Sequence, residues 1–222
     1  MADLVTLKYP KKSHRRKVQI PKSSKDLAEF FGIMLGDGGI NNPWQANITL
    51  NAVKDRQYSL YIQKLVQLLF AIASTSFIYK NKDAVRILIN GVSIVDFLVS
   101  KGLPRGNKLK AGLKIPQWIL RKAEYRRAVV RGLIDTDGCI YIHVHTISGK
   151  TYRNIGLTFS SRSPELIFQV STIFEEFGIM PHVNARGTDI YLYRKEAVER
   201  YLKIFGSSNK RISSVYKKWR GA

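Results

Sequence analysis

The chain has 222 residues, and its 45% hydrophobic and 11% aromatic content is typical of a globular protein and excludes a disordered one. It carries 37 Lys and Arg residues against 16 Asp and Glu residues, so its formal net charge at pH 7 is +21. A surface this basic suits a polyanionic partner, because binding then releases counterions. Composition therefore favours a nucleic-acid partner over all others.

The sequence also predicts the compartment. No apolar run reaches about 18 residues, so no membrane-spanning helix and no membrane partner are expected. The chain lacks the basic start and apolar core of a signal peptide. Its one cysteine cannot form an internal disulfide, which favours a reducing environment. We expect an intracellular protein, in the cytoplasm or nucleoid of a prokaryote or in an organelle.

The first 22 residues are expected to form an extended basic arm, with a solvated tail as the alternative. A first half, residues 23–112, then begins with a helix whose capping box we assign to Ser23 and Asp26. Alternating residues around Ile48 and Leu50 predict a strand. In chain order we expect a helix at 23–39, a strand in 40–51, a helix at 55–72, a hairpin at 76–91, a helix at 92–103 and a basic loop at 104–116.

The second half, residues 113–222, repeats this order. We expect one continuous helix at 117–138, a hairpin at 140–161, a helix at 164–178, a hairpin at 181–194, a helix at 195–206 and then a basic tail. Each half therefore reads as helix, hairpin, helix, hairpin, helix. Two copies with parallel content usually pack about a pseudo-twofold axis.

One segment makes the duplication explicit. Residues 30–40, FFGIMLGDGGI, recur as residues 130–140, VRGLIDTDGCI. The small residues Gly32 and Gly36, and their counterparts Gly132 and Thr136, are four apart and share one helix face. Glycine in a helix interior costs about 1 kcal/mol relative to alanine, which is sensible where two backbones approach closely. If the two helices cross there, their last residues meet.

Those last residues are Asp37 and Asp137. Two adjacent carboxylates repel each other, and a bound divalent cation reverses that balance. Carboxylates with open coordination positions suit Mg²⁺, which keeps waters and accepts phosphate oxygens. The alternative is that Asp-Gly only ends each helix in a turn. The duplicated context in a strongly basic chain favours the metal site.

The two segments resemble the nine-residue motif of the LAGLIDADG homing endonucleases, and the second copy is closer. The resemblance spans roughly residues 23–218. It implies an α+β fold of two pseudo-symmetric αββαββα repeats, with the motif helices as the central interface and saddle-shaped antiparallel sheets on the DNA major groove. It also implies hydrolysis of both DNA strands across the minor groove, leaving 3′ overhangs.

The resemblance implies that Asp37 and Asp137 are metal ligands, with Gly36 and Thr136 as further metal-site residues. The implied cofactor is Mg²⁺ or Mn²⁺, whereas Ca²⁺ could bind without supporting cleavage. The repeat pairs Lys108 with Lys210 and Asn51 with Ser160. The two lysines would stabilise the charged transition state, with Lys110 as the alternative in the first half. Asn51 and Ser160 would orient the attacking water.

The motif copies depart from the family pattern at two places. Leu35 replaces the first Asp of the motif while Asp135 keeps it, so Asp135 is not expected in a symmetric metal site. Arg131 replaces a small residue and is expected to face away from the helix pair.

The hairpins supply the candidate DNA contacts. On residues 139–146 we expect Ile140, Ile142 and Val144 to face the core, and alternate residues to face outward. Arg, Asn and His can read base edges, while Lys mostly contacts phosphate. The candidates are Asn47, Thr49, Lys80, Lys82, Arg86, Tyr141, His143, His145, Lys150, Arg153, Asn154, Thr158, Asn184 and Arg186.

Other interpretations remain open. A zinc site at Cys139, His143 and His145 is disfavoured because it lacks a fourth ligand. Tyr191 and Tyr193 are expected to be packing residues rather than stacking platforms. The main hypothesis is a monomeric endonuclease acting on double-stranded DNA with a long, near-unique target. The alternatives are a maturase that binds intron RNA and a DNA-binding regulator without cleavage.

Overall fold

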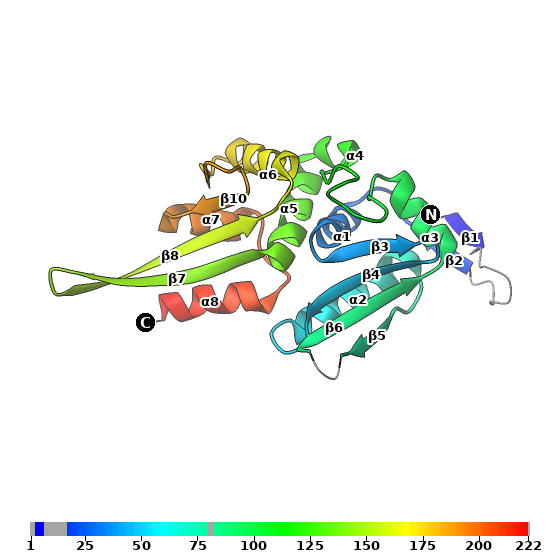
Figure 1. Ribbon diagram of the computed structural model, residues 1–222, viewed down its shortest axis with the longest axis horizontal. Helices are drawn as coiled ribbons and strands as arrows, with labels where there is room; N and C mark the ends of the chain where they lie inside the picture. The colour runs from blue at the N-terminus through cyan, green and yellow to red at the C-terminus, as the bar shows by residue number, and fades with distance from the viewer. Residues whose placement is uncertain (1–2, 7–16, 80–81, 222) are drawn as a thin grey trace.

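The computed structural model describes residues 3–6, 17–79 and 82–221, and it contains two similar halves (Figure 1). The elements of the first half are β1 (Asp3–Thr6), β2 (Lys17–Ile20), α1 (Lys25–Gly36), β3 (Gly38–Asn42), β4 (Gln45–Asn51), α2 (Arg56–Phe70), β5 (Thr75–Ile78), β6 (Ala84–Asn90) and α3 (Val92–Ser100). Those of the second are α4 (Gln117–Leu120), α5 (Ala123–Asp137), β7 (Gly138–Ile147), β8 (Lys150–Ser160), α6 (Pro164–Glu176), β9 (His182–Val183), β10 (Asp189–Leu192), α7 (Lys195–Ile204) and α8 (Lys210–Arg220).

Each half contains one four-stranded antiparallel sheet. The strand orders, β3-β4-β6-β5 and β7-β8-β10-β9, are the same when counted from the motif helix of each half. The expected α+β fold of two αββαββα repeats is therefore confirmed. Among the helices of the described residues, none is both long and apolar enough to cross a bilayer.

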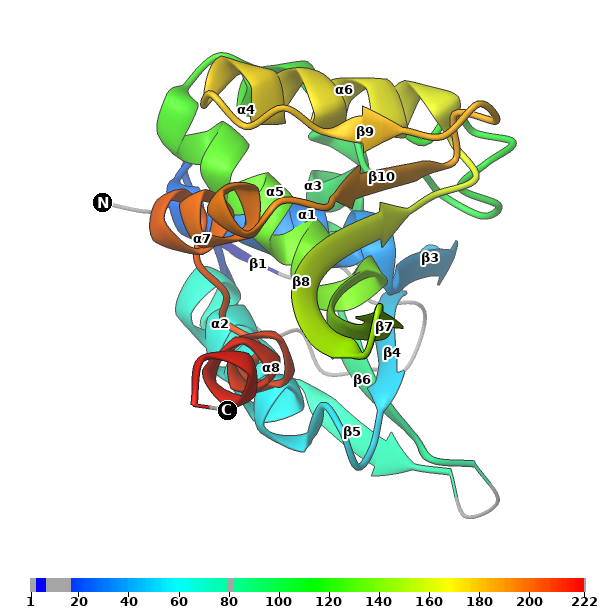
Figure 2. The same ribbon diagram turned by 90° about the vertical axis from the view of Figure 1, so that its left-hand side faces the viewer.

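The motif helices α1 and α5 form the centre of the molecule. They lie side by side in both views (Figures 1 and 2). A Cβ on Gly32 would lie 2.2 Å from the Val129 carbonyl oxygen, and one on Gly132 would lie 2.4 Å from that of Glu29. The predicted close approach is confirmed, because neither position has room for a side chain.

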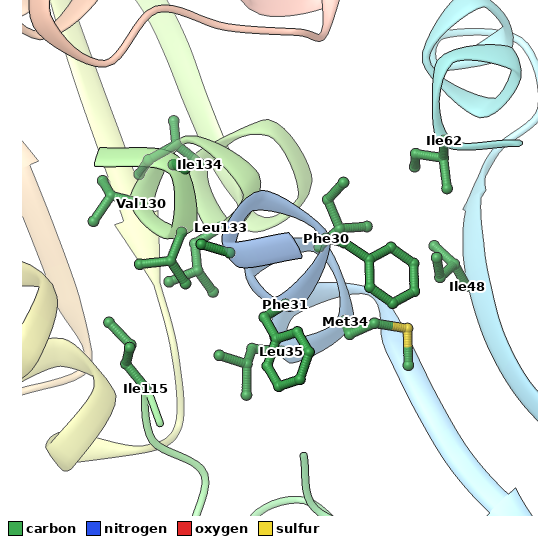
Figure 3. Close-up of a cluster of buried hydrophobic side chains, with 14 of the residues drawn as sticks. Phe30, Phe31, Met34, Leu35, Ile48, Ile62, Ile115, Val130, Leu133 and Ile134 are labelled. Carbon is green, nitrogen blue, oxygen red and sulfur yellow. The ribbon is translucent and has the colours of Figure 1, made fainter. Parts of the chain in front are cut away.

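Apolar residues around this helix pair form a continuous core. Phe30 and Met34 of α1 point toward Ile48 and Ile62 of the first half (Figure 3). In the second half, Leu157 and Phe159 of β8 are fully buried on the helix side of their sheet. One face of each sheet is therefore covered by helices. The opposite face, called the outer face below, carries the alternate residues of each strand.

Local structure differs from the sequence predictions at the helix ends. The N-cap of α1 is Ser24, whose Oγ accepts from the Leu27 backbone N–H, while the Ser23 carbonyl accepts from the Tyr125 hydroxyl. The predicted continuous helix at 117–138 is wrong. It breaks between α4 and α5, where Lys122 is extended, because Trp118 packs on Phe31 and donates to the Lys101 carbonyl.

Three further segments differ from expectation. Residues 40–51 were assigned one strand, but they contribute to the hairpin β3–β4, as the predicted order of helix, hairpin, helix, hairpin, helix requires. The predicted basic tail is the helix α8, capped by the Asn209 side chain, with Ile212, Val215 and Trp219 packed on the core. Val144 was expected in the core but is 56% exposed, because the β7–β8 hairpin extends beyond the helices (Figure 1).

The basic N-terminal arm is partly described. Its strands β1 and β2 pair antiparallel, and β2 contacts α2 and α3. Val18 is fully buried, so this strand is packed on the first half rather than solvated. Residues 1–2 and 7–16 of the arm lie outside the described residues.

Candidate active site and nucleic-acid face

Asp37 and Asp137 are brought together at the ends of the motif helices. A Cβ on Gly36 would lie 2.1 Å from Thr136 Oγ1 and 3.1 Å from Asp137 Oδ2, so the Asp137 carboxylate lies against the last turn of α1. Burial and then the negative charge of Asp137 raise the pKa of Asp37 to about 7. Burial raises the pKa of Asp137 to about 6, although the charge of Lys108 lowers it. The surrounding protein therefore compensates the negative charge of each carboxylate poorly.

Lys108 lies at the same point. Its Nζ donates to the Leu35 carbonyl at 2.9 Å and to the Gly36 carbonyl. Both lie in the last turn of α1, where backbone carbonyls have no partner within the helix. Burial lowers the pKa of Lys108, and the charges of Asp137 and Asp37 oppose that shift. The ammonium group is therefore fixed beside both acids.

The structure brings Arg211, rather than Lys210, to the corresponding end of α5. Arg211 donates to the carbonyls of Gly138 (3.3 Å) and Asp135 (3.2 Å) and forms an ion pair with Asp55 at 3.1 Å. Its charge lowers the pKa of Asp37. Lys210 is exposed in the first turn of α8. The repeat indicates this position only weakly, because Arg211 is adjacent to the lysine that the repeat selects.

Asn51 and Ser160, the predicted water-orienting pair, have different surroundings. Asn51 Oδ1 accepts from the backbone N–H groups of Val53 (3.0 Å) and Lys54 (2.7 Å). Ser160 Oγ donates to Asp189 Oδ1 at 2.5 Å. An open pocket of about 500 Å³ is lined by Leu35, Gly36, Lys108, Leu109, Leu113, Asp137, Ser160, Ser161, Arg162, Thr188 and Asp189. The structure thus groups four predicted site residues (Gly36, Lys108, Asp137 and Ser160) around one pocket.

A buried polar network lies behind the acids and was not predicted. Glu29 of α1 is 1% exposed and accepts from the hydroxyls of Tyr61 (2.9 Å) and Ser208 (2.6 Å). It also forms an ion pair with Arg131 of α5. Arg131 was expected to face away from the helix pair, and that expectation is wrong, because this ion pair joins the two motif helices.

Asp135 belongs to the same network. Its carboxylate accepts from Ser207 Oγ at 2.5 Å and from the backbone N–H of Ser208 at 2.7 Å, so it holds the segment that leads into α8. Burial raises its pKa to about 7, although these hydrogen bonds lower it. A lone motif Asp gave no sequence signal for this structural contact.

The outer face of the first sheet carries hydrogen-bonding side chains. Arg86 Nε donates to Thr49 Oγ1 at 3.3 Å across adjacent strands. Asn47 lies on the same face but is only 9% exposed, and its amide donates to the Gly39 carbonyl. Lys82 is exposed beside β6, whereas Lys80 lies outside the described residues.

The outer face of the second sheet is more aromatic. Cys139, Tyr141, His143 and His145 of β7 lie opposite Thr158, Gly156, Asn154 and Tyr152 of β8, respectively. Tyr191 and Tyr193 stack with ring centroids 5.2 Å apart. Tyr193 is 57% exposed, so it packs on Tyr191 at the surface and not in the core.

The remaining candidates for DNA contact are divided. Lys150 and Arg186 are exposed at hairpin ends. Arg153 is exposed but alternates with Asn154, on the opposite face, and its carbonyl accepts from Trp219 of α8. The Asn184 amide holds its own turn by bonds to Thr188 and Asp189. Across residues 3–6, 17–79 and 82–221 no cluster of three His, Cys, Asp or Glu side chains could hold a metal, so the zinc alternative gains no support.

Family models match both halves of the chain. A LAGLIDADG-like domain matches residues 124–212, and the WhiA LAGLIDADG-like domain matches residues 28–106. The chain is a LAGLIDADG protein with two motif copies. A curated relative of this LAGLIDADG protein, the tRNA-splicing ligase RtcB of Pyrococcus furiosus, is 28% identical over 203 residues. The match covers 82% of this chain and 20% of the relative, so the chain spans about a fifth of that protein's length.

Solved structures share the fold of this LAGLIDADG protein. The I-LtrWI LAGLIDADG homing endonuclease bound to target DNA has a TM-score of 0.59 at 11% identity, covering 88% of this chain and 89% of that one. The I-SmaMI LAGLIDADG homing endonuclease bound to cleaved DNA has a TM-score of 0.60 at 8% identity, covering 91% of this chain and 89% of that one. I-DmoI in complex with DNA and Ca has a TM-score of 0.53 at 16% identity, covering 83% of this chain and 91% of that one.

Proposed function

We propose that this LAGLIDADG protein is a site-specific, divalent-metal-dependent endonuclease that hydrolyses both strands of double-stranded DNA and leaves 3′ overhangs. The observation that carries the proposal is the meeting of Asp37 and Asp137, one from each repeat, beside Lys108 at the junction of the two halves. The neighbours with the same fold are homing endonucleases bound to DNA, which supports this substrate. A net charge of +21 supports binding to a polyanion.

The acids fit a divalent cation. Each has a raised pKa, and the charge of Asp137 adds to the shift of Asp37, so a cation between them would relieve both burial and repulsion. The described residues offer two carboxylates rather than a complete ligand set, which suits Mg²⁺ or Mn²⁺ completed by water and phosphate oxygens. Asp37 and Asp137 would hold it, with Gly36 and Thr136 beside them. Bound metal would stabilise negative charge at the phosphate and the leaving 3′ oxygen.

The protein's own groups have separable tasks in this reaction. Water adds to the scissile phosphorus, the P–O3′ bond breaks, and the 3′ oxygen leaves with a proton. Lys108, already fixed at the helix end, places positive charge near the phosphate. Asn51 and Ser160 are proposed to orient the attacking water. The outer faces of the two sheets are proposed to contact base edges and phosphates of the duplex.

Both acids come from one chain, so we propose that a monomer suffices for cleavage of both strands. With one free cysteine and a DNA substrate, we propose that it acts in a reducing intracellular compartment.

A cleavage selection tests the proposed function. Randomised duplex DNA is incubated with the protein and Mg²⁺, and cut ends are captured and sequenced, with EDTA as the metal-free control. We expect a single long site with 3′ overhangs in Mg²⁺ and none in EDTA. Asp37→Asn and Asp137→Asn should each lose double-strand cleavage while binding the selected duplex nearly as well. Cleavage retained by both variants would contradict the proposal, and specific binding without any cleavage would instead favour the regulator or maturase alternatives.

A further inference from the structure

The two halves differ at the residue that faces the proposed water-orienting side chain. In the first sheet, Asn51 of β4 lies opposite Ala84 of β6. In the second sheet, Ser160 of β8 lies opposite Asp189 of β10. Each pair is the last one of its ladder, β4–β6 in the first sheet and β8–β10 in the second, and the second sheet has a carboxylate there where the first has a methyl group.

The contact made by Asp189 fixes the direction of the Ser160 hydroxyl. Ser160 Oγ donates to Asp189 Oδ1 at 2.5 Å, which leaves the Oγ lone pairs free to accept from water. Hydrogen bonds from Ser160 and then Thr188 hold the pKa of Asp189 below its usual value, so the acceptor stays ionised near neutral pH. Asp189 and Ser160 line the same pocket as Asp137 and Lys108.

The first half presents the opposite polarity. Asn51 Oδ1 already accepts two backbone N–H groups, so its amide nitrogen is the group left to meet a water. That nitrogen can only donate, whereas Ser160 is set to accept. A water that donates to Ser160 keeps its oxygen lone pairs free of that hydrogen bond. A water that accepts from Asn51 instead uses one of its oxygen lone pairs in the hydrogen bond.

We infer that Asp189 is a positioning residue for cleavage of one DNA strand, because it orients Ser160 as an acceptor for the water that attacks in the second half. This inference rests on the proposed endonuclease function. The structure gives Asn51 no equivalent partner at Ala84, so the two strands should be cut by differently assembled halves of the site. Removing Asp189 should slow one strand and leave the other close to wild type.

Strand-resolved kinetics test this. The duplex selected with the wild-type protein is labelled with a different dye on each strand, and single-turnover rates are measured with Mg²⁺. Asp189→Ala and Ser160→Ala should each slow the same strand, on the order of tenfold to a hundredfold, so nicked DNA accumulates. The double variant should be no slower than the slower single one, because both changes remove one interaction. Asn51→Ala should slow the other strand.

Two further variants separate positioning from a structural effect, since Asn184 and Thr188 also bond to Asp189. Asp189→Asn keeps the size of the side chain but only one acceptor oxygen, which can serve either Ser160 or the donors Asn184 and Thr188, so it should slow the same strand by a smaller factor than Asp189→Ala. Asp83→Ala removes an exposed acid next to Ala84 and should leave the ratio of strand rates unchanged. Binding of the duplex should stay within about threefold for the Asp189 variants.

The outcomes distinguish the two proposals. Equal slowing of both strands, unchanged rates, or additive effects in the double variant would overturn the role of Asp189 while the endonuclease function stands. A wild-type protein that cuts neither strand in Mg²⁺ would overturn the proposed function, and this inference with it.

Discussion

The crossing of α1 and α5 should not tolerate one added carbon. In Gly32→Ala the new Cβ would lie 2.2 Å from the Val129 carbonyl oxygen and 3.1 Å from Gly132 Cα, and both are backbone atoms of a rigid helix. Ordinary contact begins near 3.4 Å, so the helices must separate by about 1.2 Å. Overpacking of this kind costs about 1–3 kcal/mol, and occasionally more. The higher helix propensity of alanine offsets roughly 1 kcal/mol.

Because the clash is with backbone, we expect the overpacking cost at the upper end and a net loss of about 2 kcal/mol in the free energy of unfolding. For a chain of this size that lowers the midpoint of thermal unfolding by about 4–8 °C. Urea and thermal unfolding measure it directly. Gly39→Ala is the matched control, since its Cβ would meet nothing closer than 3.8 Å, and it should stay within about 0.5 kcal/mol. Equal stability of the two variants would refute the close helix crossing.

Three other predictions follow from the buried charges and the basic surface. The folded-state pKa values of Asp37 and Asp135 (each about 7) and Asp137 (about 6) lie above the ordinary 3.8, so the folded protein binds more protons than the unfolded one between those limits. Without metal, stability should therefore fall as pH rises from about 4 to about 7, and a flat profile from urea titrations would contradict this. Glu29→Ala leaves the Arg131 charge without its partner and should cost about 3–5 kcal/mol in urea unfolding, whereas a loss below about 1 kcal/mol would mean that the pair is not formed. Affinity for duplex DNA should fall by roughly a thousandfold or more between 50 and 200 mM salt if about six to ten phosphates are contacted, and a flat response would show that the basic surface is not the binding face.

The elements that have strong periodicity or a repeat were predictable from the sequence. The close helix crossing at Gly32 and Gly132 was predictable, because small residues at helical spacing recur in both copies of the motif. Such residues allow two helix backbones to approach closely. The helix α8 was missed because its apolar residues, Ile212, Val215 and Trp219, are diluted by basic neighbours. The exposure of Val144 could not be predicted, since alternation shows which face a residue takes and not where the helices underneath end.

The site was partly predictable for the same reason. Asp37, Asp137 and Lys108 followed from the repeat, and the structure places them together. The residue that contacts α5 is Arg211, one position after the predicted Lys210. The helix α8 begins at this point, and the start of the helix determines which side chain reaches α5. The role inferred for Asp189 depends on strand pairing across 29 residues, which no local pattern encodes.

A Mn²⁺ titration of the protein with its selected duplex, followed by electron paramagnetic resonance, tests whether Asp37 and Asp137 hold one metal ion. The wild-type complex should deplete free Mn²⁺, and either Asp37→Asn or Asp137→Asn alone should weaken this binding at least tenfold while the duplex stays bound. Undiminished Mn²⁺ binding in either variant would show that the two acids do not form one site.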